Sequence, residues 1–285
     1  MLKPPVPDTR PSGSADAPLD SSAPTVLAGC ISYLAKVFAI ADMDVRKLRR
    51  DPTELLTRAV QPILWMLVFG EVFAKAHAIP TGNLDYIAFL APGILAQSVL
   101  FIAIFNGISV IWERDLGIVH KFLASPTPRT ALVLGKAVAA GVRALTQGVI
   151  VYLLALALGV KMYWSFPAFS GVVVLVLLGA ALFSTFSLII ACIVKTRERF
   201  MGIGQLLTMP LFFASNAIYP TEIMPDWLKG IAHVNPLTYE VDGLRALMLA
   251  GGASSIGLPT DFAVLALVLA LLVVIGGLMY PRLIT

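Results

Sequence analysis

Six polar side chains stand within apolar stretches long enough to cross a membrane: Gln97, Asn106, Arg143, Gln147, Gln205 and Asn216. Polar groups are costly in hydrocarbon, so such residues are the usual pointers to function in a membrane protein. Arg143 is the most costly of them, because it carries a charge. Two interpretations stay open for this residue. It lines a substrate path, or it is paired with a carboxylate or with backbone carbonyls at a helix interface.

Aromatic side chains in the same stretches can also line a path for a lipophilic molecule. Phe212 and Phe213 are adjacent near the end of one apolar stretch. At helical spacing, aromatic side chains more often pack against other helices or touch lipid. Both interpretations of this pair stay open.

The charged stretch of residues 113–130 separates two apolar runs. Its charges cannot lie in hydrocarbon, so the stretch must lie in water or at a membrane surface. Asp115 can cap a short amphipathic helix, which Ser125 and Pro126 end. A short helix on a loop of a membrane protein is well suited to receive force from a soluble partner.

Residues 219–260 are not a plain loop. Asn235 and Pro236 read as an N-cap followed by proline at the first helical position, and a shorter helix precedes them. Both helices are too brief to span a membrane, so they predict a re-entrant or interfacial hairpin. Asp242 and Arg245 stand three residues apart on one helix face and are expected to pair and hold the hairpin.

The chain contains none of the motifs GxxxxGK[ST], HExxH or GxSxG. Its histidines, His77, His120 and His233, fall in different predicted loops, which makes a metal site or a nucleophile–histidine pair a weak prospect. We therefore expect a chain that is not an enzyme and that itself binds no nucleotide, cofactor or metal.

Composition predicts an all-α integral membrane protein. Of the 285 residues, 58% are hydrophobic and 13% are charged, and the mean hydropathy is +0.86. A soluble domain has roughly 45–50% apolar and about 25% charged residues. Within residues 51–285 we expect six spans, by the criterion of about 20 predominantly apolar residues. These lie near residues 55–73, 86–112, 131–159, 166–194, 200–218 and 262–283.

The N-terminal segment divides into two parts. Residues 1–25 are rich in proline and lack an apolar core, which predicts a disordered tail. Residues 26–50 carry a stripe that includes Leu34, Phe38 and Ala41 at helical spacing, with basic residues mostly off it. This pattern predicts an amphipathic helix that lies in the membrane interface, in contact with lipid headgroups.

Lysine and arginine residues gather on one side of the predicted membrane. They precede the first span, occupy the 113–130 loop, follow the fourth span and end the chain. The positive-inside bias therefore places both termini and the 113–130 loop in the cytoplasm, and residues 219–260 at the outer face.

Three local motifs, together with the layout of an amphipathic helix and six spans, resemble one family. The first is Glu113-Arg114 followed by Gly117, Leu123, Ser125-Pro126 and Arg129; the second is a proline-bearing fifth span running into Ala217-Ile218-Tyr219-Pro220 and Met224-Pro225; the third is Asn235-Pro236-Leu237-Thr238-Tyr239 with Asp242, Leu244 and Arg245. From about residue 26 onward, the chain resembles the membrane subunit of ABC-2 type exporters. This group includes daunorubicin-resistance, nodulation-factor and polysaccharide export permeases.

The resemblance implies a half-transporter in the cell's inner (plasma) membrane. A second permease subunit, identical or different, would complete the membrane part, and a separate ABC ATP-binding subunit would bind ATP and magnesium. No nucleic-acid partner is expected. The loop of residues 113–130 would couple the two kinds of subunit through Glu113, Arg114, Asp115, Gly117, Leu123, Ser125, Pro126 and Arg129. The outer hairpin would depend on Tyr219, Pro220, Asn235, Pro236, Tyr239, Asp242 and Arg245.

The expected cargo is a lipophilic small molecule or drug, with lipid or polysaccharide also open. An ion-coupled secondary transporter that works without an ATPase is the main alternative, and it would require acidic residues buried in the membrane. A membrane-embedded enzyme would require a convergent acid–base or metal set, which the sequence does not show. A membrane scaffold that transports nothing stays open.

Overall fold

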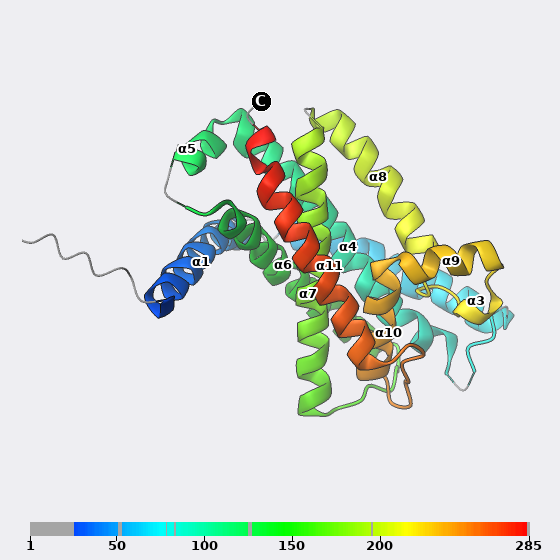
Figure 1. Cartoon of the computed structure of the whole chain (residues 1–285). Coiled ribbons are helices and arrows are strands. Elements are labelled where there is room, and N and C mark those ends of the chain that lie inside the picture. The colour runs from blue at the N-terminus through cyan, green and yellow to red at the C-terminus, as the bar shows by residue number, and fades with distance from the viewer. Residues whose placement is uncertain are drawn as a thin grey trace, which may run out of the picture.

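A computed structural model describes residues 26–50, 53–77, 79–82, 84–124, 127–194 and 196–283. The predicted tail of residues 1–25 lies outside these ranges. The described residues form helices joined by turns and loops and have no strand, only an isolated bridge between Met162 and Leu249 (Figure 1). Its elements are α1 (Val26–Arg50), α2 (Thr53–Leu64), η1 (Trp65–Gly70), α3 (Glu71–Ala76), α4 (Tyr86–Asp115), α5 (Ile118–Ala124), α6 (Arg129–Ala157), α7 (Phe166–Ile193), α8 (Arg197–Phe213), η2 (Thr221–Ile223), α9 (Asp226–Val234), α10 (Pro236–Met248), α11 (Leu258–Met279) and η3 (Tyr280–Leu283).

The all-α membrane architecture predicted from composition is confirmed. Five stretches of the described chain are helices long and apolar enough to cross a membrane, and they match five of the six predicted spans. These are Ala59–Ala76, Tyr86–Asp115, Arg129–Ala157, Phe166–Ile193 and Leu258–Leu283.

The remaining prediction, the fifth span at residues 200–218, is longer than the helix in the structure. Helix α8 has 17 residues, about 26 Å at 1.5 Å per residue, and ends at Phe213. Pro210 lies in its last turn, and the Ser215 hydroxyl then donates a hydrogen bond to the Phe212 carbonyl. The chain therefore turns where the hydropathy pattern alone predicted a continuous helix.

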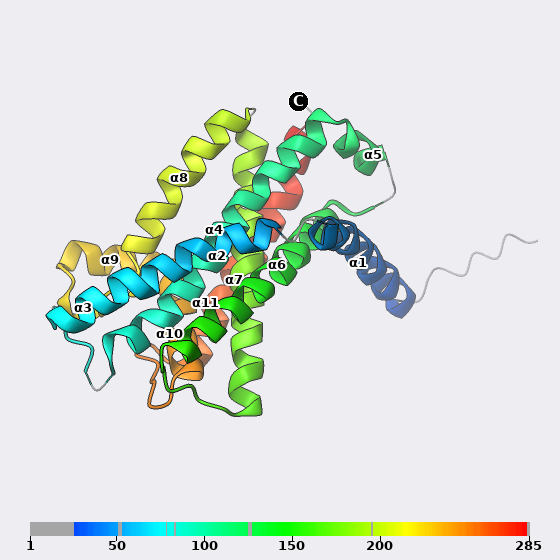
Figure 2. The same ribbon diagram turned by 180° about the vertical axis from the view of Figure 1, so that it is seen from behind.

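Helices α4 and α7 form the centre of the bundle, with α6, α10 and α11 packed around them (Figures 1 and 2). Their apolar side chains form two core clusters. One includes Ile104 and Phe183, and the other includes Val110 and Leu188. The polar residue Asn106 lies between the two clusters on α4. A layer of polar side chains therefore crosses the middle of an otherwise apolar core.

The two ends of the bundle differ. Helix α5, the start of α8 and the C-terminus lie at one end, which we call the α5 end (Figure 1). The loops that precede α4, α7 and α11 lie at the opposite end, which we call the α10 end (Figures 1 and 2). The connections between the long helices therefore gather at two opposite ends of the bundle.

Helix α1 has the bounds predicted for the amphipathic helix and lies against α6. The hydroxyl of Tyr33 donates a hydrogen bond of 3.0 Å to Thr130 on α6. Val37 and Ile40 are buried, whereas Phe38, on the predicted apolar stripe, is 61% exposed. Helix α1 thus has apolar side chains both packed on the bundle and exposed.

Candidate functional site

The 113–130 segment forms a short, separately folded helix at the end of α4. Gly117 has a φ of +71°, a left-handed backbone conformation that suits glycine, and its amide donates to the Arg114 carbonyl. This turn ends α4 and allows α5 to begin at Ile118 in a new direction. Ser125 and Pro126, predicted to end the helix, lie outside the described residues, as does the side chain of Leu123.

Helix α5 is anchored on one side and exposed on the other. Val119 is fully buried against the core cluster of the α5 end. Leu116 is 67% exposed, and His120 and Lys121 are also exposed. Arg129 begins α6 and is exposed as well. The loop therefore presents an edge of mixed apolar and basic character that can contact another protein.

Glu113 does not belong to that exposed edge. It is 3% exposed, and its Oε1 accepts a hydrogen bond of 2.6 Å from the Nζ of Lys136, which is 2% exposed. The pair joins the last turn of α4 to α6 directly beneath the loop. Glu113 is thus a support for α5 rather than a contact for a partner, a role that the sequence motif alone does not reveal.

Asp115 does not cap α5 as predicted. It is the last residue of α4, and its carboxylate accepts hydrogen bonds from Arg114 at 2.9 Å and from Arg197 at 2.7 Å. The Arg197 guanidinium also lies 3.5 Å from the ring centroid of Trp112. These contacts compete with capping for the carboxylate, and they tie the end of α4 to the start of α8.

At the α10 end, the predicted short helices are present. The side chain of Asn235 accepts a hydrogen bond from the Leu237 amide and so caps α10, with Pro236 at the first helical position. Its Nδ2 also donates to the Leu211 carbonyl at 2.6 Å. Asn235 therefore fixes α10 against the end of α8.

The tyrosines and Pro220 of the predicted hairpin make local contacts. Tyr219 donates a hydrogen bond to the Phe213 carbonyl, and Tyr239 donates to the His233 carbonyl at 2.7 Å. Pro220 immediately precedes η2. Burial raises the pKa of the Tyr219 hydroxyl, which keeps it a neutral donor. These residues hold the hairpin in shape.

The predicted ion pair between Asp242 and Arg245 is absent, although both residues lie in the described chain. Asp242 instead accepts hydrogen bonds from Ser254, Ser255 and the Ile256 amide. Arg245 donates to the Asn216 carbonyl at 2.8 Å and lies 3.8 Å from the centroid of the Phe89 ring. Each charge found a partner from another segment, because α10 packs inside the bundle rather than on its surface.

The polar residues predicted to line a path are brought together only in part. Arg143 donates a hydrogen bond of 2.7 Å to the Asn106 side chain, which donates in turn to Ser184 on α7. Gln97 is buried on α4. Arg143 is therefore paired at a helix interface, but its partner is a neutral side-chain amide and not the carboxylate or backbone carbonyls that we expected.

Phe212 and Phe213 belong to a separate cluster. Their ring centroids lie 5.4 Å apart, and Phe212 meets Trp65 of η1 edge-on at 5.6 Å. The hydrogen bonds and ring contacts of the described residues do not join this cluster to Arg143. The aromatic pair therefore packs α8 against the first span.

Sequence reasoning missed Glu240 on α10. This residue is fully buried, and neither carboxylate oxygen has a hydrogen-bond partner among the described residues. Helix α10 is not a spanning helix, and burial raises the pKa of this carboxyl well above its ordinary value. A signal was available, because Glu240 stands three residues after Leu237 and four before Leu244, on the apolar face of the helix.

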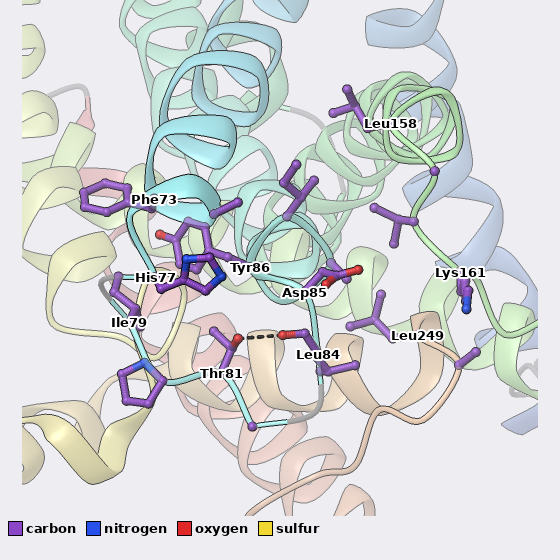
Figure 3. A pocket seen from close by; sticks show the side chains of 18 residues that line it. Phe73, His77, Ile79, Thr81, Leu84, Asp85, Tyr86, Leu158, Lys161 and Leu249 are labelled. Atoms are coloured by element: carbon purple, nitrogen blue, oxygen red, sulfur yellow. Dashed lines mark hydrogen bonds between the residues drawn. The ribbon is translucent and has the colours of Figure 1, made fainter.

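A cavity of about 820 Å³ opens at the α10 end (Figure 3). It lies between the end of α3, the start of α4 and the segments that follow α6 and α10. His77, Asp85, Lys161 and Tyr86 are among the residues that line it. The Thr81 hydroxyl donates to the Leu84 carbonyl at 2.6 Å and closes the loop that forms its rim.

These features define an all-helical, multi-pass membrane protein with a short, partly exposed helix at one end. Residues 35–249 match the family model described as ABC-2 type transporter. The chain therefore belongs to the ABC-2 type transporter family and is the membrane subunit of an ABC transporter.

Several permeases are similar to this chain. It is 28% identical over 223 residues to the transport permease ycf38 of Cyanophora paradoxa, covering 75% of this chain and 74% of that one. It is 26% identical over 198 residues to the daunorubicin resistance ABC transporter permease protein DrrB1 of Streptomyces coeruleorubidus, covering 69% of each. It is 25% identical over 215 residues to the inner membrane transport permease YadH of Escherichia coli (strain K12), covering 72% of this chain and 80% of that one.

Proposed function

We propose that this chain is the membrane subunit of an exporter that moves a lipophilic small molecule or drug out of the cytoplasm or the inner leaflet. A separate ABC subunit binds ATP and magnesium and docks on α5. The observation that carries the proposal is the exposed edge of α5, formed by Leu116, His120 and Lys121, above the buried Glu113–Lys136 pair. In this arrangement the α5 end and both termini lie in the cytoplasm of a cell with the protein in its inner membrane.

The contacts beneath α5 supply a route for force. A displacement of α5 acts on α4 directly and on α6 through the Glu113–Lys136 pair. It acts on α8 through Arg197, which binds Asp115 and stacks on Trp112. ATP can drive the cycle only if it binds one arrangement of the assembly better than another. A second permease subunit, identical or different, would complete the transport path.

Relatives support a lipophilic cargo. The name of DrrB1 refers to daunorubicin resistance. In this chain, the exposed apolar residues of α2 and α11, among them Val60, Leu64, Leu267 and Leu278, provide surfaces for lipid or for a second subunit. Lipid or polysaccharide remains an alternative cargo.

The test is affinity purification from native membranes, followed by an ATPase assay of the eluate. We expect an ABC ATP-binding subunit to co-purify and to hydrolyse ATP. If no ATPase co-purifies under gentle detergent, the proposal loses its energy source.

Glu240 favours a second candidate, an ion-coupled secondary transporter. A buried carboxyl without hydrogen-bond partners can carry a proton, which is what such a transporter requires. Glu240→Gln keeps the shape of the protonated acid and cannot release a proton. Export that survives in Glu240→Gln and stops without ATP supports the exporter. Export that a pH gradient drives without ATP, and that Glu240→Gln abolishes, supports the second candidate.

A further inference from the structure

A small polar pocket lies between α2, α4 and α6. Its volume is about 80 Å³, and it is lined by Gln61, Pro62, Ser98, Phe101, Ile102 and Gln147. A water molecule requires about 10–15 Å³ of free cavity volume, so the pocket has room for several water molecules or for one small polar group.

Gln147 makes this pocket unusual. It is 1% exposed, yet neither its Nε2 nor its Oε1 has a hydrogen-bond partner among the described residues. Buried side-chain amides are normally hydrogen-bonded, because an unsatisfied group loses the bonds it made in water. The hydroxyl of Ser98 donates to the Ile94 carbonyl of its own helix. Ser98 therefore leaves the Gln147 donors free for a group that enters the pocket.

Arg143 places a positive charge beside the pocket. It precedes Gln147 by four residues, so the two side chains are neighbours on one face of α6. Its Nε is buried without a partner, and the side chain that it does bind, Asn106, is neutral. Among the described residues, Arg143 forms no ion pair. An anion near Gln147 would therefore meet a favourable field, and a cation an unfavourable one.

The wall of the pocket is an irregular helix. Pro62 removes a backbone hydrogen bond from α2, and six residues of π-helix, Trp65–Gly70, begin three positions later. Such irregular turns are frequent at functional sites. The outer side of α2 exposes Val60 and Leu64. A single helix that is already distorted therefore separates the polar pocket from an apolar surface.

We propose that this pocket binds the anionic head of an amphiphile, with Gln147 as the hydrogen-bond donor and Arg143 as the source of charge. The apolar part of the ligand lies along the α2 surface formed by Val60 and Leu64. Its role as a substrate site rests on the proposed export function, but the binding site itself does not. The shared chemistry is a carboxylate or phosphate on an apolar chain, either an exported molecule or an anionic membrane lipid.

The test uses the full chain in nanodiscs of zwitterionic phosphatidylcholine. The probe is dansylaminoundecanoic acid, and its trimethylammonium analogue of equal chain length is the cationic comparison. Binding is followed by energy transfer from tryptophan to dansyl. We expect the anionic probe to bind at least about tenfold more tightly than the cationic one, and Gln147→Leu to abolish that preference. The matched control is Thr146→Val, since that hydroxyl is satisfied by the Arg143 carbonyl of its own helix.

A second variant keeps the test independent of misfolding. Arg143→Glu replaces the positive charge beside the pocket with a negative one, so it should reverse the preference toward the cationic probe, a gain that an unfolded protein cannot show. The proposal is overturned if the cationic probe binds the wild type equally well, or if Gln147→Leu retains the anionic preference.

Two further arms separate the source of the ligand and the export function. If anionic lipid fills the site, adding phosphatidylglycerol to the nanodiscs weakens probe binding to the wild type but not to Gln147→Leu. If the probe binds as expected but ATP drives no accumulation in inside-out vesicles, the binding site stands and the exporter assignment fails.

Discussion

The buried pair of Glu113 and Lys136 offers the sharpest energetic test of how α5 is supported. At 2.6 Å between Nζ and Oε1, and with an effective dielectric constant of about 20, the attraction is about 6 kcal/mol. Desolvation of two charges that are almost fully buried offsets most of this gain. Lys136→Met keeps the length of the side chain but leaves the Glu113 carboxylate without the ammonium. We expect the free energy of unfolding to fall by about 3–5 kcal/mol.

The double variant distinguishes a lost charge pair from a packing defect. Glu113→Gln with Lys136→Met removes both charges, so its cost should be smaller than the sum of the two single costs by about 0.5–3 kcal/mol. The matched control is Lys121→Met on α5, where the side chain is exposed and the effect should stay within about 0.5 kcal/mol. Unfolding is followed by tryptophan fluorescence as sodium dodecyl sulfate is added to mixed micelles. Strict additivity of the single variants would refute the reasoning.

Three further predictions test the positioning of other elements. Gly93→Ala on α4 places a Cβ about 2.8 Å from the Cα of Ala217, so we expect a loss of about 1–3 kcal/mol in the same unfolding assay; wild-type stability would show that the backbone can shift there. Asn235→Ala removes the α10 cap and a hydrogen bond to the end of α8, and should cost about 1–3 kcal/mol; a loss below about 0.5 kcal/mol would contradict the role of the cap. Arg197→Ala should leave stability within about 1 kcal/mol, because the pair with Asp115 is partly exposed, but should reduce ATP-driven transport; undiminished transport would remove α8 from the route of force.

Hydropathy predicted most of the fold because membrane helices follow from few rules. Long apolar stretches must be helical to satisfy their backbone groups in lipid, so five predicted spans agree with the structure within a few residues. The same reasoning fails at α8. Hydropathy counts apolar residues, whereas the end of α8 depends on a local hydrogen bond from the Ser215 hydroxyl and on the side-chain amide of Asn235, which comes from a separate segment.

Local sequence rules also located the cap of α10 but not the partners of its charges. Asn235 followed by Pro236 predicts the start of a helix from adjacent residues alone, so the prediction needed no tertiary information. Asp242 and Arg245 each have a potential partner three residues away. They bind other segments instead, because α10 lies among α4, α7 and α11. Spacing on one helix cannot reveal such competition.

The predicted coupling residues include both buried and exposed side chains, and sequence spacing could not tell them apart. The motif around Glu113 predicts a coupling loop, but it could not separate the exposed residues of that loop from the buried ones. Lys136 lies in the following helix, and only the antiparallel packing of α4 and α6 brings it to Glu113. Charged residues near a loop are therefore a weak guide to a docking surface until their burial is known.

The most direct test of the central claim is whether the exposed edge of α5 holds the ATP-binding subunit. Leu116→Asp combined with Lys121→Glu changes that edge without touching the buried pair. The matched control, Trp164→Asp combined with Lys161→Glu, makes the same kinds of change on exposed residues between α6 and α7, outside the α5 end. Affinity purification from native membranes should recover the ATPase with the wild type and the control, and lose it with the α5 variant. Equal recovery of the ATPase with all three proteins would contradict the account.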